Sequence, residues 1–579
     1  MSDKVERNPY STATRGLWRT FVIVGLFSAI VNILMLTGPM FMLQVYDRVL
    51  SSGSVATLQG LFLIVVGLYA FMALYDFLRA RLLSRASYRL DQTVGAVAFA
   101  KWVRGGSDPG DKMTRPLSDL GVVRQFLGSP GVLGIFDLPW VPFYLAVVMF
   151  IHPWLGWLAI GGAGVVVVMA LANQWTTRMH YARAMAMDGT ESFFVEQARR
   201  NAEAVLPLGM LDRVKNRWSE MHTAGLAIGQ VGGDRAEGFT ASSKAFRMLL
   251  QSALLGLGGY LALQQEITPG MIIAGSIIAG RALAPLDQVI GNWRGIVRTR
   301  EAHKRLKETL DNQKPANIAM RLPEPKGFVN LVNVYKYPPE RLAGGEQPPI
   351  LQQISFELEP GDALGVIGPS ASGKSTLARL LIGSWRPDAG EVRLDGATLD
   401  QWQPEELGQF IGYLPQSLEL LSGTIRDNIC RFDPEAQDED IIAAARIAGV
   451  HEMVLKLAEG YGTRIGYGTP QLSGGQVQRI GLARAVYGMP KLVVLDEPNS
   501  NLDASGDEAL SQAIATMREA GSTVVVMAHR PSAIAAVTKV LVLKEGRVVH
   551  FGPKDEVLRK ATRPTPVETP QRKGVVHAS

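Results

Sequence analysis

The stretch "ALGVIGPSASGKSTLARLLIG", Ala363 to Gly383, decides the fold of the second half of the chain. Its apolar start predicts a buried strand, a glycine-rich loop follows, and the residues after Lys374 predict a helix. Two glycines allow the loop to wrap phosphate groups, Lys374 meets the β- and γ-phosphate oxygens, and the Ser375 hydroxyl holds Mg²⁺. The expected ATP-binding residues of this loop are Gly368, Ser370, Gly373, Lys374, Ser375 and Thr376.

The stretch "KLVVLDEP" supplies a second buried strand, which ends in two carboxylates. Asp496 is expected to bind Mg²⁺ through water, and Glu497 to polarise the attacking water. An acidic pair at a strand end is also compatible with a helix cap, but its place after a phosphate-binding loop favours catalysis. Strand-like runs alternate with helical patterns around both stretches, which predicts an α/β domain.

The stretch "QLSGGQVQRIGLARAV", Gln471 to Val486, predicts another helix whose start faces an anion. A serine and two glycines open it, and a helix start offers free backbone N–H groups and the positive end of a dipole. The chain therefore carries two phosphate-facing helix starts, and the residues alone do not say why.

The composition separates the chain into a membrane part and a soluble part. Its 579 residues are 47% apolar, and long charge-poor runs fill the first half. The net charge of +6 is not gathered into a basic stripe interleaved with aromatics, so no nucleic acid is expected. The single cysteine, Cys430, excludes an intrachain disulfide framework and a cysteine-cluster metal site, argues against a cysteine peptidase domain, and is expected to be buried.

Six apolar runs have about the 20 residues that span a bilayer. They are Phe21–Leu43, Leu58–Leu78, Val132–Ile151, Leu155–Asn173, Phe246–Leu263 and Met271–Ile290. The first is too long for a signal peptide core. Lys and Arg gather before the first run and in the long loops 79–131 and 174–245, which places both termini and these loops in the cytoplasm. Both loops are expected to be helical extensions that turn near "GGSDPGDK" and "VLPLGML".

The expected fold is therefore multidomain, with an all-α polytopic membrane domain of six transmembrane helices followed by an α/β P-loop nucleotide-binding domain. The expected boundaries are a cytoplasmic tail 1–20, a transmembrane domain 21–311, a linker 312–326, an ATPase domain 327–560 and a disordered tail 561–579.

Polar residues within or beside the apolar runs leave alternatives open. Asp137, Asp47 and Arg48 are compatible with an intramolecular ion pair or a helix-end anchor. The other interpretation is contact with a periplasmic partner or a passing substrate. His152, beside a proline at the membrane surface, is expected to be an interfacial residue without a metal or proton role.

The ordered motifs of the second half resemble those of ABC ATPases from about Gly327 to Val557. LSGGQ, Leu472–Gln476, matches the signature, and Asn501–Asp503 the D-loop. Gln416 matches the Q-loop glutamine, His529 the switch histidine, and Tyr337 the aromatic that stacks on adenine, with Tyr335 as a competitor. The catalytic residues implied are Glu497, His529 and Gln416, and the metal-binding residues are Ser375, Gln416 and Asp496. The further ATP-binding residues implied are Tyr337, Ser473, Gly474, Gly475, Gln476 and Asp503.

In that family two nucleotide domains dimerise head to tail, and each ATP lies between the P-loop of one and the signature of the other. The resemblance thus implies a homodimer in which the second helix start serves the partner's ATP.

Two membrane phrases, "GPMFMLQVYDRVLSSGS" and "FDLPWVPFYLAVVMFIHPWLG", narrow the resemblance. They are similar to the permease/ATPase of type I secretion systems, in the branch that exports RTX-type proteases and lipases and has no N-terminal peptidase-like domain. This implies an inner-membrane ATPase of a Gram-negative cell, surrounded by membrane lipids. Its partners would be a membrane fusion protein, an outer-membrane channel and an unfolded passenger protein with an uncleaved C-terminal signal.

One departure from the family pattern precedes the signature, where Tyr467 stands in place of the usual Glu. That stretch contacts the inner loops in the family, so the departure puts the details of coupling in doubt. The alternative function is export of lipid or small molecules with the same architecture. A soluble ABC ATPase acting on DNA or ribosomes conflicts with the six spans, and a gated channel conflicts with an intact Glu497.

Overall fold

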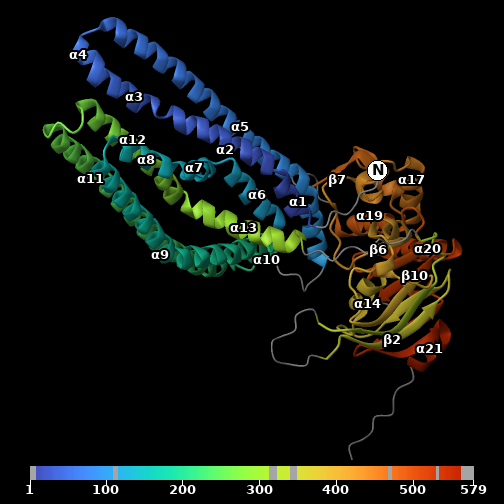
Figure 1. Cartoon of the computed structure of the whole chain (residues 1–579). Helices are drawn as coiled ribbons and strands as arrows, with labels where there is room; N and C mark the ends of the chain where they lie inside the picture. The colour runs from blue at the N-terminus through green and yellow to red at the C-terminus, as the bar shows by residue number, and fades with distance from the viewer. Residues whose placement is uncertain are drawn as a thin grey trace, which may run out of the picture. The chain divides into compact units, whose positions relative to one another are not determined.

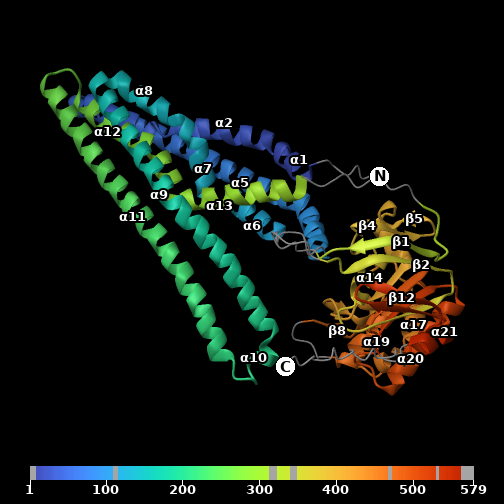
Figure 2. The same cartoon turned by 90° about the horizontal axis from the view of Figure 1, so that it is seen from below.

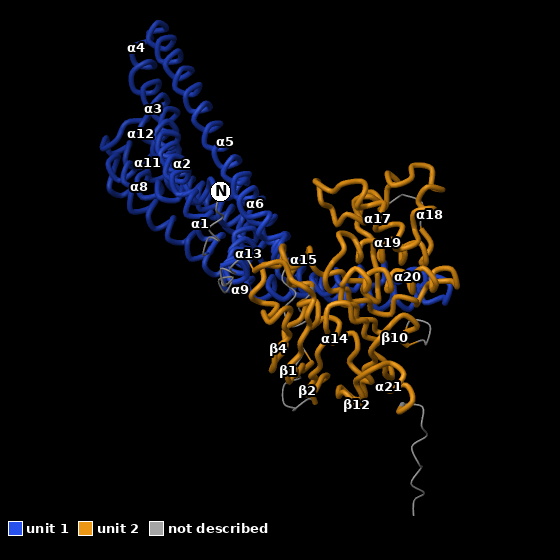
Figure 3. Tube along the Cα trace, turned by 90° about the vertical axis from the view of Figure 1, so that its right-hand side faces the viewer, with its two compact units in different colours: residues 1–103, 113–314 blue, residues 104–112, 315–579 orange. Residues whose placement is uncertain are grey.

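The computed structural model describes residues 8–107, 115–311, 322–338, 348–466, 472–529 and 534–561. The chain forms two compact units, residues 1–103 with 113–314 and residues 104–112 with 315–579 (Figure 3). Figure 1 labels the elements of both units along the chain. Each unit has its own core.

The first unit is entirely helical in its described part. Its elements are α1 (Pro9–Gly16), α2 (Trp18–Leu34), α3 (Thr37–Gln44), the π-helix η1 (Val45–Val49), α4 (Leu50–Ser52), α5 (Val55–Ser107), α6 (Pro116–Leu127), α7 (Pro130–Asp137), the 3₁₀ helix η2 (Leu138–Trp140), α8 (Val141–Ile151), α9 (Pro153–Arg200), α10 (Ala202–Val205), α11 (Leu211–Leu263), α12 (Pro269–Gly291) and α13 (Trp293–Asp311). Six helical spans are long and apolar enough to cross a membrane, which confirms the six predicted runs.

Three of these helices are much longer than a bilayer requires. α5 and α11 have 53 residues each and α9 has 48, whereas about 20 residues cross the hydrocarbon core. α9 and α11 pack side by side (Figure 2), and the chain turns between them near Val205–Leu211, as the sequence predicts. Most of the other predicted turn, at "GGSDPGDK", lies outside the described residues.

Three buried polar residues of this unit, Asp137, Arg79 and Asn32, are bonded into one cluster. Asp137 pairs with Arg79 at 2.9 Å, and both side chains are almost fully buried. Asn32 donates to the same carboxylate at 2.7 Å. A buried charge is costly unless it is paired and hydrogen-bonded, and here both conditions are met. The structure therefore supports the interpretation of Asp137 as a member of an intramolecular ion pair.

Asp47 anchors the start of α12. Its carboxylate accepts hydrogen bonds from the Thr268 hydroxyl at 2.5 Å and from the Gly270 N–H at 2.9 Å. The π-helix η1 presents Asp47 at this point, while Arg48 is exposed. At the same end of the unit, Nε2 of His152 lies 2.9 Å from the carboxylate of Glu266, in the connection between α11 and α12. Asp47 is thus a helix-end anchor, which is one of the expected alternatives.

The second unit is an α/β domain built on two larger sheets. Its strands are β1 (Val329–Lys336), β2 (Leu351–Leu358), β3 (Ala363–Ile367), β4 (Ala389–Leu394), β5 (Ala397–Thr398), β6 (Ile411–Leu414), β7 (Gly423–Thr424), β8 (Arg464–Ile465), β9 (Leu492–Asp496), β10 (Thr523–Ala528), β11 (Lys539–Lys544) and β12 (Arg547–Pro553). Its helices are α14 (Lys374–Leu381), α15 (Pro404–Phe410), α16 (Ile425–Ile429), α17 (Asp438–Ile447), α18 (His451–Leu455), α19 (Gly474–Val486), α20 (Ala504–Glu519) and α21 (Lys554–Ala561), with the 3₁₀ helices η3 (Leu399–Gln401) and η4 (Gly460–Gly462).

The larger sheet has the order β12-β11-β3-β10-β9-β6, and β11, β3, β10, β9 and β6 run parallel in it. The antiparallel sheet has the order β2-β1-β4-β5. One apolar cluster fills the space between α14 and the two sheets, and the other lies under α16, α17, α19 and α20. Cys430 belongs to the second cluster and is buried, as expected. The α/β character predicted from the alternating pattern is confirmed.

Candidate functional site

Four neighbouring parallel strands bring the predicted nucleotide residues to one edge of the larger sheet. In the register of this sheet, Ile367 lies opposite Ala528, and Asp496 lies opposite Met527. β6 adds a fourth strand next to β9. Because parallel strands end at the same edge, the loops after β3, β10, β9 and β6 open side by side, where ligands of α/β sheets bind.

The glycine-rich loop after β3 leaves no room for side chains at two positions. A Cβ at Gly368 would lie 2.1 Å from the carbonyl oxygen of Leu543, and one at Gly373 would lie 2.6 Å from Leu351. Gly373 also has a φ of +102°, which a side chain strongly disfavours. It caps α14 without any side-chain hydrogen bond, so the first N–H groups of this helix stay open to an anion.

Lys374 begins α14 and turns its side chain back into the loop. It is 6% exposed, and its Nζ donates to the carbonyl oxygens of Gly368 at 2.8 Å and Pro369 at 3.0 Å. Burial lowers the pKa of this ammonium, and the nearby charges of Glu497 and Asp496 oppose that shift. A buried cation held by neutral carbonyls is ready to pair with phosphate oxygens.

Of the three residues expected to hold Mg²⁺, two lie in contact with each other. The Ser375 hydroxyl donates to Asp496 at 3.3 Å, and Asp496 is 3% exposed. Burial raises the pKa of Asp496, while the Ser375 hydrogen bond lowers it. A hydroxyl beside a carboxylate is the hard oxygen set that Mg²⁺ prefers. Gln416 follows β6 at the same edge, but its side chain is exposed and hydrogen-bonds to neither residue within the described ranges.

The remaining loop residues also fit a phosphate group. Ser370 is exposed at the loop, and Thr376 is nearly buried in the first turn of α14. Ser372 has a buried hydroxyl that finds no hydrogen-bond partner among the described residues. An unpaired buried hydroxyl in a loop with open N–H groups fits a bound anion, so the residues present fit ATP and Mg²⁺.

Glu497 and His529 contact each other at the ends of β9 and β10. Oε1 of Glu497 lies 2.9 Å from Nε2 of His529. Glu497 has a φ of +52°, a left-handed backbone conformation that is uncommon for a residue other than glycine. Such conformations gather at functional sites, because the surroundings must hold them. The geometry agrees with a water-activating carboxylate oriented by a histidine, and both roles stay predictions.

The signature stretch forms the predicted helix start, and its own side chains cap part of it. Ser473 is the N-cap of α19, and its hydroxyl accepts the N–H of Gln476 at 3.3 Å. The Gln476 side chain accepts the N–H of Ser473 at 2.8 Å, which completes a capping box. Gly474 and Gly475 form the first turn, and a Cβ at Gly475 would lie 3.0 Å from the carbonyl oxygen of Asn501.

Asp503 has a structural contact within its own chain. It caps α20 by accepting the N–H of Gly506 at 2.9 Å, and these hydrogen bonds lower the pKa of its carboxyl. Arg479 lies 3.8 Å from it. The expected contact of Asp503 with nucleotide stays a prediction.

The fold does not distinguish between Tyr337 and Tyr335 as the residue that stacks on adenine. Tyr337 follows β1, and its N–H donates to Asp388 at 2.8 Å, whereas Tyr335 lies inside β1 opposite Ala389. Both side chains are half-buried. The departure at Tyr467 lies outside the described residues.

The sequence interpretation missed Gln478, whose side chain joins α19 to the loop after β9. Its Nε2 donates to the carbonyl oxygen of Pro498, and its Oε1 accepts the N–H of Asn501 at 3.1 Å. A signal was present, because Gln478 lies four residues before Leu482 and eight before Val486 and so shares their buried helix face.

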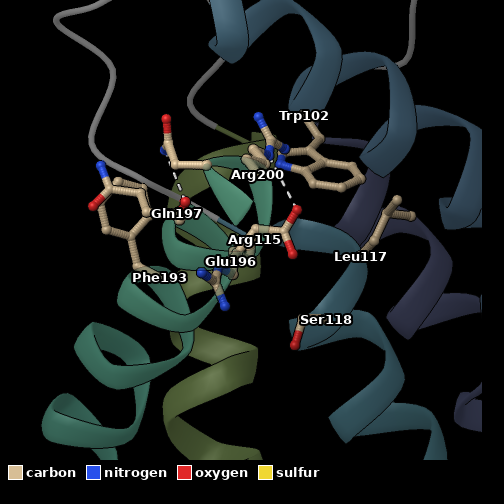
Figure 4. A pocket seen from close by; sticks show the side chains of 9 residues that line it. Trp102, Arg115, Leu117, Ser118, Phe193, Glu196, Gln197 and Arg200 are labelled. Carbon is tan, nitrogen blue, oxygen red and sulfur yellow. Dashed lines mark hydrogen bonds and ion pairs between the residues drawn. The ribbon is translucent and has the colours of Figure 1, made fainter. Parts of the chain in front are cut away.

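The first unit has a cavity of about 640 Å³ of its own (Figure 4). It is lined by Trp102, Arg115, Leu117, Ser118, Phe193, Glu196, Gln197, Arg200 and Asn201. Its Arg200 is already paired with Glu196 at 3.0 Å. None of the predicted nucleotide-binding residues is among those that line it, so the cavity is not the site that the motifs predict.

Family models match both halves of the chain. The model described as "ABC transporter transmembrane region" matches residues 21–282, and that described as "ABC transporter" matches residues 351–500. The type I secretion system ATP-binding protein PrsD of Rhizobium meliloti (strain 1021) is 44% identical over 561 residues, which are 96% of this chain and 95% of PrsD. The leukotoxin translocation ATP-binding protein LktB of Mannheimia haemolytica is 26% identical over 94% of this chain and 77% of LktB.

The fold of the chain is also similar to that of a solved structure, a bacterial Atm1-family ABC exporter with ATP bound. The TM-score is 0.78 at 22% identity, over 94% of this chain and 97% of the other. At this identity the likeness concerns the fold alone. It agrees with the predicted order of a six-helix membrane domain followed by an α/β nucleotide-binding domain, and the fold class is confirmed.

Proposed function

Because this chain belongs to the ABC transporter family, we propose that it drives an unfolded protein out of a Gram-negative cell as the inner-membrane ATPase of a type I secretion system. ATP hydrolysis coupled to transport follows from the family. That the transported molecule is a protein is what we propose beyond the family assignment. The observation that carries it is the 44% identity to a type I secretion ATP-binding protein along nearly the whole length of both chains.

The passenger that we propose is an RTX-like protease or lipase with an uncleaved C-terminal signal. Two other relatives are named for the translocation of toxins. They are LktB and the toxin RTX-I translocation ATP-binding protein of Actinobacillus pleuropneumoniae, and each is 26% identical to this chain. The Lys- and Arg-rich loops support a topology with both termini in the cytoplasm. A homodimer, a membrane fusion protein and an outer-membrane channel complete the proposed complex.

The residues at the sheet edge have different roles in the proposed hydrolysis of ATP. When bound, ATP and Mg²⁺ supply the phosphoryl group to be transferred and the charge that stabilises its transfer. Lys374 and the open N–H groups of α14 bind phosphate oxygens, while Ser375 and Asp496 offer oxygens to the metal. Glu497 orients water, and His529 holds the Glu497 carboxylate through their 2.9 Å contact.

Glu497→Gln is expected to keep ATP binding and to stop turnover. The amide preserves the shape of the side chain but cannot accept a proton from water, and losing such a group costs roughly 10²–10⁴ in rate. ATPase activity and ATP binding of the purified protein measure both effects. Hydrolysis within a few-fold of wild type would remove Glu497 from the mechanism.

The protein passenger is tested by export in cells that also make the adaptor, the channel and a glycine-rich repeat protein of the same system. The passenger is expected in the medium with the wild-type chain and with Gln512→Glu, a control at an exposed position of α20. It is expected inside the cells with Glu497→Gln. Export that persists without the chain, or without the C-terminal segment of the passenger, contradicts the proposal. ATPase stimulation by lipid with no passenger in the medium would favour the lipid exporter.

A further inference from the structure

The Gln478 side chain fills a gap between α19 and the segment Glu497–Asp503, here named the β9 loop. Gln478 is 6% exposed. Its amide N–H groups point to the carbonyl oxygens of Glu497, at 3.4 Å, and Pro498, and its amide oxygen accepts the Asn501 N–H. Such a side chain makes the hydrogen bonds that a neighbouring strand would make, so it fixes the path of the backbone.

The β9 loop needs this support because it begins with a disfavoured conformation. Glu497 has a φ of +52° and persists there only if its surroundings hold it. On one side its N–H donates to the carbonyl oxygen of Met527 in β10 at 3.1 Å. On the other side the loop is held by Gln478. The position of the Glu497 carboxylate against His529 therefore depends on a residue of α19.

The start of α19 packs against the same loop. The Cα of Gly475 approaches Asn501 so closely that an added Cβ would lie 3.0 Å from its carbonyl oxygen. One turn further along, Arg479 lies 3.8 Å from Asp503. The first turns of α19 and the β9 loop thus form one packed piece, with Gln478 at its buried centre.

We propose that Gln478 is a positioning residue that makes the setting of Glu497 depend on the position of the signature helix α19. This inference rests on the proposed function and on the homodimer that the family resemblance implies, in which α19 serves the partner's ATP and Glu497 serves the ATP of its own chain. A displacement of the α19 start moves the backbone of the β9 loop, because Gln478 hydrogen-bonds to four of its residues, Glu497, Pro498, Ser500 and Asn501. Binding at one ATP site then adjusts catalysis at the other.

The test is Gln478→Glu in the full-length protein. The new carboxylate keeps an acceptor for the Asn501 N–H but sets negative charge against the carbonyl oxygens of Glu497 and Pro498. The expected result is a fall in kcat of at least about tenfold near pH 8, because a displaced catalytic group loses up to about 100-fold in rate. KM for ATP and ATP binding are expected to stay near the wild-type values.

Acidification is expected to restore the variant. Burial among carbonyl oxygens raises the pKa of the introduced carboxyl, so it regains a proton and donates to Pro498 as the pH falls from about 8 to about 6. The charged and titratable groups on the elements near the position are Arg479 on α19, Glu497 and Asp503 on the β9 loop, Asp507 in the first turn of α20, and His529 after β10. These titrate in the wild type as well, so kcat is compared as the ratio of variant to wild type at each pH.

A control variant and a stability measurement separate a positioning role of Gln478 from a general effect of the new charge or of misfolding. Gln512→Glu is the matched control, since it makes the same change at an exposed position of α20 and is expected to keep wild-type kcat at every pH. Thermal unfolding of each variant separates positioning from folding. A wild-type kcat for Gln478→Glu, a loss that is equal at both pH values, or a loss confined to ATP binding would overturn the proposal. If the passenger is not exported by the wild-type chain, the proposed function fails; if export and the loss of turnover in Glu497→Gln are as expected but Gln478→Glu keeps wild-type kcat, this inference alone fails.

Discussion

The second unit has two helix starts that are predicted to face phosphate, and the two are capped differently. α14 follows Gly373 and has no side-chain cap, so its first N–H groups stay open. α19 follows Ser473, and the reciprocal hydrogen bonds of Ser473 and Gln476 occupy its start. At α14 a ligand meets N–H groups that no side chain caps, whereas at α19 it must compete with the Ser473 hydroxyl for the Gln476 N–H. The difference agrees with a site that holds its ATP throughout and a second site that engages an ATP brought to it.

The sharpest test of this comparison asks whose ATP each helix start binds. Lys374→Ala disables the P-loop of its own chain, and Ser473→Arg blocks the α19 start with bulk. If α19 serves the partner, a mixed dimer carries both lesions in one site and leaves the other whole. ATP occlusion is then expected at about one site per dimer, against none in either mutant homodimer.

Occlusion is measured on mixed dimers purified through two different tags. A mixed dimer that occludes no more ATP than the homodimers would show that each α19 start serves its own chain. Turnover is a weaker measure, because hydrolysis can require both sites.

The glycines at the two starts are expected to differ in their tolerance of a side chain. Gly373→Ala forces a left-handed residue and a 2.6 Å contact with Leu351, which costs about 1–3 kcal/mol. Gly475→Ala meets only the Asn501 carbonyl at 3.0 Å, and the helix gains about 1 kcal/mol from alanine. Unfolding of the nucleotide-free protein measures both. Equal destabilisation would contradict the distinction.

Ser473→Ala opens the α19 capping box and is expected to cost about 1 kcal/mol of stability. Ser473→Thr keeps the hydroxyl and serves as its control. The change is measured by thermal unfolding without nucleotide. An unchanged melting temperature would mean that the capping box does not hold the helix start.

A smaller effect is expected beside α14 from Asp496. Burial raises the pKa of Asp496 in the folded state, so its contribution to stability is present at low pH and is lost as the pH rises through that pKa. Asp496→Asn carries no charge and is expected to melt at a higher temperature than wild type near neutral pH. The gap is expected to narrow as the pH falls toward about 5. A gap that widens on acidification would contradict the assigned direction of the shift.

The sequence predicted elements better than it predicted contacts. The six spans, the P-loop, the acidic strand and the α19 start all follow local patterns of hydropathy and glycine, and all are present. The partner of Asp137 was not predictable, because Arg79 comes from a helix 58 residues away. The partners of Gln478 were not predictable for a related reason. They follow β9, whereas Gln478 lies on α19, and a polar residue on an apolar helix face does not indicate which residues it contacts.

Asp47 shows what a local pattern leaves open. The sequence marked it as a polar residue at a helix end, but its partners Thr268 and Gly270 lie more than 220 residues further along. Only the packing of α12 against η1 brings them together.

The buried position of Cys430 has a practical consequence for labelling. It is the single cysteine of the chain and is 1% exposed within the core of the second unit. Thiol reagents need an accessible thiolate, so a maleimide dye or spin label is expected to pass over it in the folded protein. A cysteine introduced at an exposed position such as Arg48 would then be the one reactive thiol in each chain. In the proposed homodimer, the distance between the labels on the two chains could then be measured without first removing Cys430.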